Sequence, residues 1–197
     1  MKLETEVDHR IAAEGHTLPR TDLSAVYALM KAAHENSIAK GWWKDGNNLA
    51  AWRHKCVMIV TELGEAIQRW RDPEWKTHRT ELRESDGKPE GFIYELADVL
   101  LRAFDLASAM NATTKAVNAD TERLIKQSTK ICAQDPFRYF LDLYTYAVWG
   151  TIPVDLWRLI AGVFAMGDFY GLDVWSAVQK KHAFNLGRPH RHGGKLS

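Results

Sequence analysis

The chain has 197 residues, of which 46% are hydrophobic and 26% are charged, and its formal net charge is +1. This is the composition of an ordinary globular protein, and the balanced charge argues against a general nucleic-acid binder or a polybasic membrane protein. Charges interrupt every apolar run well before the ~20 residues of a membrane-spanning helix, and residues 1–20 contain no apolar signal-peptide core. The sequence therefore predicts a cytoplasmic protein.

Hydrophobic periodicity predicts a chain made of helices. Residues 1–20 are polar and are expected to form an arm outside the domain, and residues 72–90 are interpreted as a mobile connection. We expect helices over approximately residues 22–39, 49–71, 91–110, 136–148, 153–170 and 173–185, with a further helix-compatible polar stretch at 121–130.

Several boundaries have a physical reason. Gly41 follows the first helix as a C′ glycine, Pro153 stands where a proline opens a helix, and Gly171 ends the helix that Pro153 begins. No strand-type alternation of useful length occurs. The sequence therefore predicts an all-α helical bundle, in one domain over residues 21–187 with a basic tail at 188–197.

Two acidic pairs at helical spacing are the main functional signal, Glu62/Glu65 and Glu95/Asp98. Residues three apart share one face of a helix, and both pairs are embedded in apolar sequence. Closely spaced carboxylates in a core repel one another and resist desolvation, and a cation between them relieves both problems. Ligands that are all oxygen favour Mg²⁺ or Mn²⁺. The alternative for each pair is a solvated helix face.

A di-iron bundle is the natural competitor, and it requires Glu-x-x-His pairs on core helices. The Glu-x-x-His pair of this sequence is Glu6/His9, which lies in the polar arm. The iron site is therefore disfavoured. Four further histidines show no ligand spacing and are assigned structural or solvated roles: His34, His54, His78 and His182.

The last expected helix carries a second polar set, Lys181, Asn185 and Arg188, at spacings of four and three. Lysine and arginine bind phosphate, and asparagine binds an oxygen or a metal-bound water. The alternative is a solvated basic helix end, favoured by the helix dipole. Trp42 and Trp43 lie beside the first acidic helix, where one of them could stack on a nucleobase, although most tryptophans pack in a core.

Four segments in order resemble MazG-like proteins of the all-α nucleoside triphosphate pyrophosphohydrolase superfamily. They are Ala33-His34-Glu35 through Ala39-Lys40-Gly41-Trp42-Trp43, then Val60-Thr61-Glu62-Leu63-Gly64-Glu65-Ala66, then Glu95-Leu96-Ala97-Asp98-Val99-Leu100-Leu101-Arg102, and finally Lys181-x-x-x-Asn185-x-x-Arg188-Pro189-x-Arg191-His192-Gly193-Gly194-Lys195. The acidic pairs match the split Glu-x-x-Glu, Glu-x-x-Asp motif of that superfamily.

The resemblance implies a four-helix catalytic bundle and Mg²⁺-dependent hydrolysis of a nucleoside triphosphate between its α and β phosphates. By position, Glu62, Glu65, Glu95 and Asp98 would be the metal ligands. The set Lys181, Asn185 and Arg188 would hold the triphosphate. Family members assemble as homodimers or homotetramers, so the same is expected here.

The chain departs from the family in one respect. About sixty residues separate the Glu-x-x-Asp helix from the last helix, so two or three additional helices are expected in an insertion at about 112–170. The run Leu159–Asp173 resembles the usual end of the Glu-x-x-Asp helix without its two acids. The insertion therefore either splits or duplicates that element.

The mechanism that we expect is metal-assisted hydrolysis, in which Glu62 or Glu65 orients or deprotonates the water that attacks the α-phosphorus. A second hypothesis is a non-catalytic bundle that binds a nucleotide or a partner and hydrolyses nothing. A third, nucleic-acid binding by the tail from Arg188 to Lys195, is disfavoured because the basic run is short.

Overall fold

The computed structural model describes residues 23–74, 81–83, 85–112, 132 and 134–191. Within these ranges the fold is all-α, as predicted, and each of the six main expected helices is present to within two residues at either end. They are α1 (Leu23–Ala39), α2 (Leu49–Arg71), α3 (Phe92–Ala109), α5 (Pro136–Val148), α6 (Pro153–Tyr170) and α7 (Val174–Leu186). The expected arm, the stretch at 121–130, Glu6, His9 and His78 lie outside the described residues.

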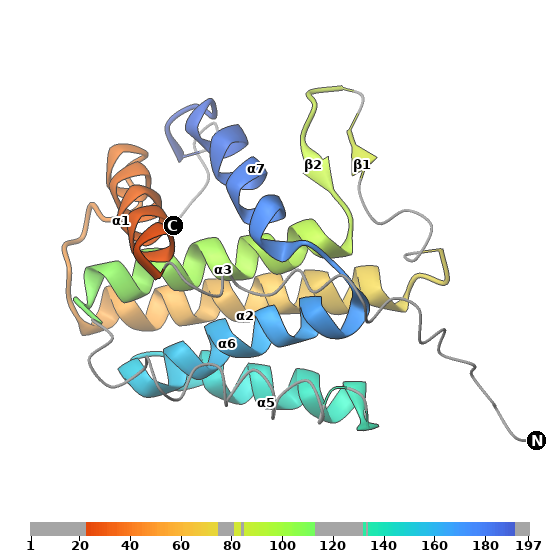
Figure 1. Ribbon diagram of the computed structural model, residues 1–197. Helices are drawn as coiled ribbons and strands as arrows, with labels where there is room; N and C mark the ends of the chain where they lie inside the picture. The colour runs from red at the N-terminus through yellow and green to blue at the C-terminus, as the bar shows by residue number, and fades with distance from the viewer. Residues whose placement is uncertain (1–22, 75–80, 84, 113–131, 133, 192–197) are drawn as a thin grey trace, which may run out of the picture.

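Helix α3 is the centre of the molecule. It contacts α1, α2, α6 and α7, and Figure 1 shows α1 and α7 above it, α2 beside it and α6 with α5 below. Fifteen of its eighteen residues are buried, because neighbours cover it on all sides. An α-helix that is apolar nearly all round must be surrounded in this way. The buried polar side chains of α3, Glu95 and Asp105, therefore require partners from neighbouring elements.

Local sequence explains where the flanking helices begin and end. The side chain of Asn48 accepts a hydrogen bond from the backbone N–H of Ala51 and caps α2, and Asp173 caps α7 through Ser176 in the same way. Gly171 ends α6 in the left-handed conformation at φ 64°, which glycine adopts without a Cβ clash. These caps fix the start of α2 and α7, which carry Glu62 and Lys181 toward α3.

The segment between α3 and α7 contains α5 and α6. Helix α6 packs on α3, while α5 packs on α2 and α6, so these two helices form a layer on the opposite side of α2 and α3 from α1 and α7 (Figure 1). Gly162 on α6 allows close packing, because a Cβ there would lie 2.5 Å from Leu143 Cδ2. The inserted helices thus extend the core and leave the α1/α7 side open for a site.

The connection after α2 contains a short hairpin that the sequence did not predict. Strand β1 (Glu81–Leu82) pairs antiparallel with β2 (Pro89–Glu90), and at its tip Arg83 binds Asp86 through two hydrogen bonds of 2.8 and 2.6 Å. Each strand has two residues, too few for a readable alternation. β2 contacts α7 and α3, so the hairpin is docked against the bundle.

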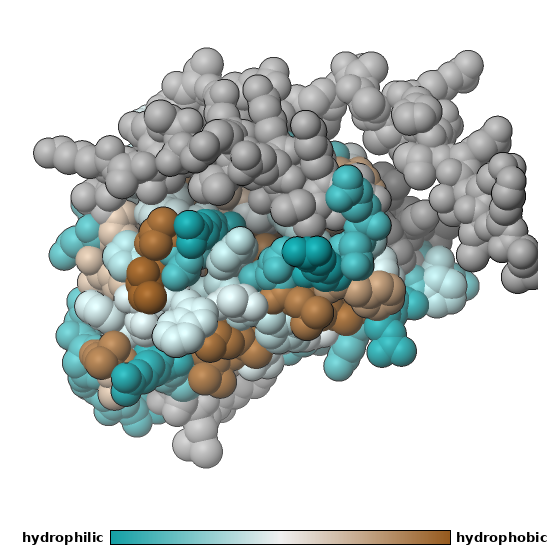
Figure 2. Space-filling model, turned by 90° about the horizontal axis from the view of Figure 1, so that it is seen from below, coloured by the Kyte–Doolittle hydropathy of each residue, from teal (hydrophilic) through white to brown (hydrophobic). Residues whose placement is uncertain are grey.

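None of the described helices combines the length and apolar character that a membrane span requires. Cys56 and Cys132 are both free and buried. On the face seen from below (Figure 2), apolar residues lie between hydrophilic ones; large exposed apolar side chains on α5 and the turn after it are Phe137, Leu141, Val148, Trp149 and Ile152.

Candidate metal and phosphate site

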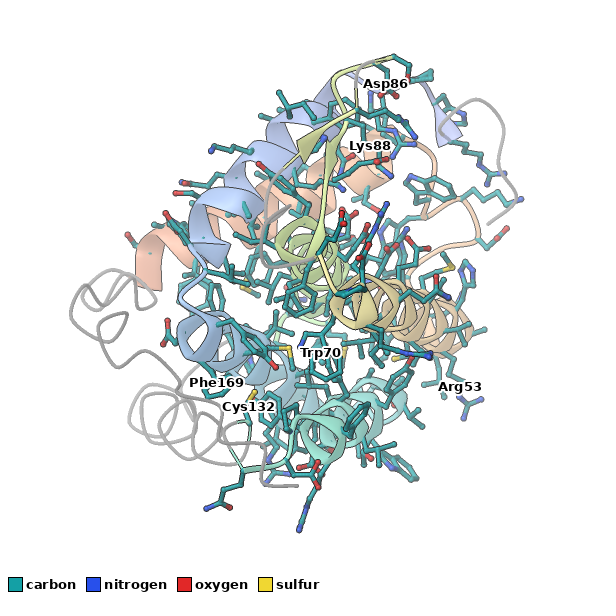
Figure 3. The ribbon with its side chains drawn as sticks, turned by 90° about the vertical axis from the view of Figure 1, so that its right-hand side faces the viewer. Arg53, Trp70, Asp86, Lys88, Cys132 and Phe169 are labelled. Atoms are coloured by element: carbon teal, nitrogen blue, oxygen red, sulfur yellow. The ribbon has the colours of Figure 1, made fainter. Side chains whose placement is uncertain are left out.

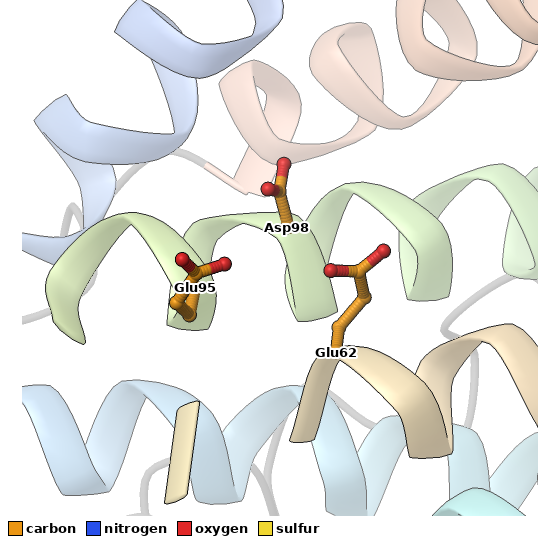
Figure 4. Close-up of side chains that lie close together, drawn as sticks. All are labelled: Glu62, Glu95 and Asp98. Atoms are coloured by element: carbon orange, nitrogen blue, oxygen red, sulfur yellow. The ribbon is translucent and has the colours of Figure 1, made fainter. Parts of the chain in front are cut away.

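The two acidic pairs lie on the adjacent helices α2 and α3, and three of their four carboxyl groups come close together. Glu62 is on α2, on the buried side of that helix with Ile59, Leu63 and Ala66, and Glu95 with Asp98 is on α3. Figure 4 shows the three carboxyl groups pointing into one space between the helices. Because α2 and α3 pack against one another, Glu62 in the second half of α2 lies beside the first two turns of α3, which carry Glu95 and Asp98.

Three of the four predicted metal ligands come together. One carboxylate oxygen from each of Glu62, Glu95 and Asp98 lies within 4.8 Å of the other two. Glu65 is exposed and is not part of this group, although it lines the adjacent cavity. We refer to Glu62, Glu95 and Asp98 as the acidic triad. The triad contains oxygen ligands alone, which suit a hard divalent cation.

Glu95 is the least compensated member of the triad. Its side chain is 5% exposed, and the ion pair that it forms among the described residues is a long one, with Arg69 Nε 3.8 Å from Oε1. Among the described residues, no donor pairs with Glu95 Oε2. Burial raises the pKa of Glu95 to about 7, with help from the neighbouring charges of Asp98 and Glu65 and against the opposing charge of Lys181. A cation at this position would remove an unsatisfied buried group.

Each of the other two triad members has a cation of its own. Arg102 Nε donates to Glu62 Oε1 at 2.6 Å, and Lys181 Nζ lies 2.8 Å from Asp98 Oδ2. Lys181 Nζ also donates to the carbonyl oxygen of Pro89 in β2 at 3.0 Å. Two of the three triad charges are therefore balanced within the protein.

A cavity of about 270 Å³ lies against the triad. Its walls come from α1, α2, α3, α7, the hairpin and the segment after α7, so residues far apart in the sequence meet there. Among the described residues, the charged groups on the wall are Lys40, Lys55, Lys88, Arg102, Arg188, Glu62, Glu65, Asp98 and Asp105. The side chain of Lys88 enters from the hairpin (Figure 3). The wall therefore carries both acidic and basic side chains.

The predicted substrate-binding residues divide into two groups. Asn185, Arg188 and Trp42 line the cavity. Lys181 and Trp43 do not: Lys181 is 1% exposed behind Asp98, and Trp43 Nε1 donates to Asp105 Oδ1 at 2.8 Å.

The position of Lys181 follows from its helix face. Residues Val174, Ala177, Val178 and Lys181 recur at spacings of three, one and three and form the buried side of α7. Lys181 thus belongs to the apolar stripe of α7. The spacing of four suggested that Lys181 and Asn185 share one face of the helix. Of these two residues, Asn185 alone lines the cavity.

Sequence reasoning missed a buried polar cluster around Asp105. The carboxylate of Asp105 is hydrogen-bonded to His34 Nδ1 at 2.7 Å, Ser37 Oγ at 2.8 Å, Trp43 Nε1 at 2.8 Å and Lys55 Nζ at 2.7 Å. Burial alone would raise the pKa of Asp105, but the hydrogen bond from His34 and the charge of Lys55 outweigh it and lower the pKa below its ordinary value. The cluster fixes α1, α2 and the turn that carries Trp43 to α3.

A signal for this cluster was present in the sequence. Asp98, Arg102 and Asp105 are four and three residues apart, so all three share one face of an otherwise apolar helix. An acid seven residues after a candidate ligand, in a helix buried on all sides, requires partners on a neighbouring helix. Lys55 likewise interrupts the buried stripe of α2. His34 is one of the four histidines that were expected to have structural or solvated roles. Its ring is hydrogen-bonded to the buried carboxylate of Asp105.

The segment after α7, residues 187–191, is tied to the turn after α1. Lys40 Nζ donates to the carbonyl oxygens of Leu186, at 2.9 Å, and of Arg188. The backbone N–H of Arg191 donates to the carbonyl oxygen of Lys40 at 3.1 Å. The side chain of Arg191 donates to the carbonyl oxygen of Gly41 through Nε at 3.3 Å and through Nη2 at 3.2 Å. These bonds position Arg188 at the cavity.

Comparison of the chain with protein-family models, with curated proteins and with solved structures found no match.

Proposed function

We propose that this protein is a Mg²⁺-dependent nucleoside triphosphate pyrophosphohydrolase of the MazG-like type, with a four-helix core formed by α1, α2, α3 and α7. The observation that carries the proposal is one cavity lined by two members of the acidic triad, Glu62 and Asp98, together with basic side chains from three other segments. Carboxylates that bind a hard cation, next to lysine and arginine, are the chemistry that a polyphosphate requires.

The residues fit a divalent cation. Glu62, Glu95 and Asp98 would hold it, with Glu65 available on the cavity wall. Glu95 Oε2, which has no hydrogen-bond partner among the described residues, offers an unused ligand atom. Mg²⁺ bound there would supply Lewis-acid stabilisation of the charge on the phosphate oxygens, as would Mn²⁺ as a substitute.

The chain's own residues account for substrate binding. Arg188 and Lys88 face the cavity as cations for the phosphate chain, and Asn185 offers an amide whose Oδ1 has no partner among the described residues. Trp42 presents an aromatic ring to the same cavity, suited to stacking on a base. Trp43 supports the loop through Asp105 instead.

Glu65 is the residue best placed to act on water. It is exposed to solvent, lines the cavity and lies one helical turn from Glu62. Its carboxylate would orient the attacking water and accept its proton, while a new P–O bond forms at the α-phosphorus and the bond to the α–β bridging oxygen breaks. The products are a nucleoside monophosphate and pyrophosphate.

A panel of nucleoside and deoxynucleoside triphosphates with Mg²⁺ tests the proposal. We expect pyrophosphate and a monophosphate from at least one substrate, with loss of turnover in Glu65→Gln and full activity in the control Arg53→Gln. Arg53 is an exposed residue of α2 that points away from the cavity (Figure 3). Release of orthophosphate and a diphosphate, or no release at all, would contradict the proposed reaction.

One observation supports a second candidate, a non-catalytic bundle that binds a nucleotide or a partner. Arg102 and Lys181 already balance Glu62 and Asp98, so two of the three triad charges need no metal. Such a protein would bind a triphosphate in the panel without converting it, and Glu65→Gln would leave that binding unchanged.

The proposal includes assembly as a homodimer or homotetramer. It is supported by the exposed apolar side chains on α5 and the turn after it, since such a group on a surface is often covered in an assembly. Light scattering after size-exclusion chromatography measures the mass directly, and a mass of 22.5 kDa would contradict this part of the proposal.

A further inference from the structure

Arg102 connects the acidic triad to the cavity. It lies one turn after Asp98 on α3, its Nε donates to Glu62 Oε1 at 2.6 Å, and its side chain lines the cavity with 31% exposure. Arginine carries five N–H donors on a planar fork. A group with this geometry can bind a carboxylate on one side and retain donors for an anion on the other.

The second internal cation, Lys181, differs in its surroundings. Its side chain is 1% exposed, and Nζ is held by the carboxylate of Asp98 and by the carbonyl of Pro89 at the same time. Lys181 is thus part of the interior, fixed between α3, α7 and β2. Of these two cations, Arg102 is the one beside space that a ligand can fill.

The charges around Arg102 favour an anion in that space. The pKa of Arg188 is lowered by burial; the charge of Asp98 opposes this shift, and the smaller effect of the positive charge of Arg102 adds to it. The pKa of His54 is lowered by burial and by the charges of Lys55 and Arg102. These cations repel one another across the cavity, and a polyanion would relieve that repulsion.

We propose that Arg102 is an internal counter-ion of Glu62 that a divalent cation displaces, and that the released guanidinium then binds the phosphate chain of the ligand. The inference rests on the proposed function, because it assigns a phosphate-binding residue to the same cavity. Its physical basis is that a cation and the guanidinium compete for the charge of one carboxylate. Cation binding and polyphosphate binding are then coupled through Arg102, and the coupling is reciprocal.

The first measurement is Mn²⁺ affinity without phosphate, by isothermal titration calorimetry and by the electron paramagnetic resonance signal of free Mn²⁺. Arg102→Gln should bind Mn²⁺ roughly five- to tenfold more tightly than the wild type, because one positive charge next to the ligand is removed. Arg102→Lys keeps the charge and should stay within about twofold of the wild type. Arg53→Gln, an exposed arginine of α2, is the matched control and should not differ from the wild type.

The second measurement is the affinity for inorganic tripolyphosphate in excess Mg²⁺, a probe that does not depend on base preference. Arg102→Gln should bind it roughly ten- to a hundredfold more weakly, the effect expected for lost charge-assisted hydrogen bonds. Arg102→Lys should also bind it more weakly than the wild type, because lysine lacks the planar fork. The two ligands therefore respond in opposite directions to the same substitution.

Mn²⁺ affinity that is unchanged or weaker in Arg102→Gln would overturn the inference, as would unchanged tripolyphosphate affinity. If Arg102→Gln loses its helical circular dichroism, Arg102→Lys decides through its tripolyphosphate affinity alone. A wild-type protein that binds no Mn²⁺ overturns the inference together with the metal site. A wild type that binds Mn²⁺ but hydrolyses no triphosphate overturns the proposed function, and both measurements on Arg102 still give an answer.

Discussion

The α-carbon of Gly41 lies directly against the imidazole of His190. A Cβ at position 41 would overlap Nε2 of that ring and lie 2.8 Å from its Cε1, and Gly41 also has φ +79°. Two constraints therefore exclude a side chain at this turn. The contact joins the turn after α1 to the segment at 187–191, whose first arginine, Arg188, faces the cavity.

Gly41→Ala should therefore impair ligand binding more than folding. We expect a roughly tenfold rise in KM, because displacement of His190 moves Arg188, a charged binding group. The matched control is Gly87→Ala: Gly87 has φ +67°, and a Cβ at that position would have nothing within 4 Å of it, so it incurs the backbone cost of about 1 kcal/mol alone. Steady-state kinetics and urea unfolding of both variants check this, and equal KM values would contradict it.

Asp105→Asn should destabilise the fold strongly. The substitution leaves the buried ammonium of Lys55 without a carboxylate partner, and breaking one side of a buried pair costs roughly 3–5 kcal/mol. The control is Asp86→Asn at the hairpin tip, where the partner Arg83 is exposed and solvent screens the pair, so a much smaller loss is expected. Urea unfolding measures both. Similar losses at the two positions would show that the Asp105 cluster contributes no more than a surface pair.

The stability of the metal-free protein should depend on Glu95 between about pH 4.5 and 7. The folded-state pKa of Glu95 is about 7, raised from 4.5 by burial, so the folded state holds this proton more tightly than the unfolded state does. The contribution of Glu95 to the free energy of unfolding is fully present below pH 4.5. It is lost as the pH rises from 4.5 through 7, and the loss is up to about 3 kcal/mol.

Glu95→Gln tests that assignment, since it removes the titrating charge and keeps the shape of the side chain. In EDTA the variant should be more stable than the wild type at pH 8 and should lose less stability between pH 5 and pH 8. Added Mg²⁺ should stabilise the wild type and leave the variant unchanged. Urea unfolding at the two pH values is the measurement, and parallel profiles would refute the shifted pKa.

Lys181 and Arg188 should respond differently to replacement by methionine. Lys181→Met removes the buried partner of Asp98 and of the Pro89 carbonyl, so we expect a loss of stability of roughly 2–5 kcal/mol. Arg188→Met should change stability by less than about 1 kcal/mol and weaken tripolyphosphate binding instead. Thermal unfolding and calorimetric titration of both variants separate the two roles. A Lys181→Met variant that keeps its stability and loses only turnover would contradict the structural role of Lys181.

The helices were predictable because their signals are local. Pro153, Gly171 and the residues that cap α2 and α7 act on their own helix, and the periodicity of each segment is read within a window of a few turns. The acidic pairs were found for the same reason: Glu62 and Glu95 stand out against the apolar residues around them.

What the sequence did not predict depends on contacts between distant segments. Asp105 is one acid on an apolar helix until α1 and α2 bring His34 and Lys55 to it. The place of Lys181 required knowing which face of α7 meets α3. The exposure of Glu65, outside the triad, depends on how α2 is rotated about its axis, because a residue three positions from a buried one can lie at the edge of the interface.

The central position of α3 sets how the length of this chain can vary. Each residue of a helix turns the chain by about 100° and advances it by about 1.5 Å. One residue inserted between Asp98 and Asp105 would therefore rotate Asp105 away from His34 and Lys55 while Asp98 stayed in place. At Gly87, in the hairpin tip, the chain is not held at a fixed spacing in this way, since nothing lies within 4 Å of a Cβ at that position. Insertions and deletions should accumulate at that tip, whereas the spacing of seven between the two aspartates should stay fixed.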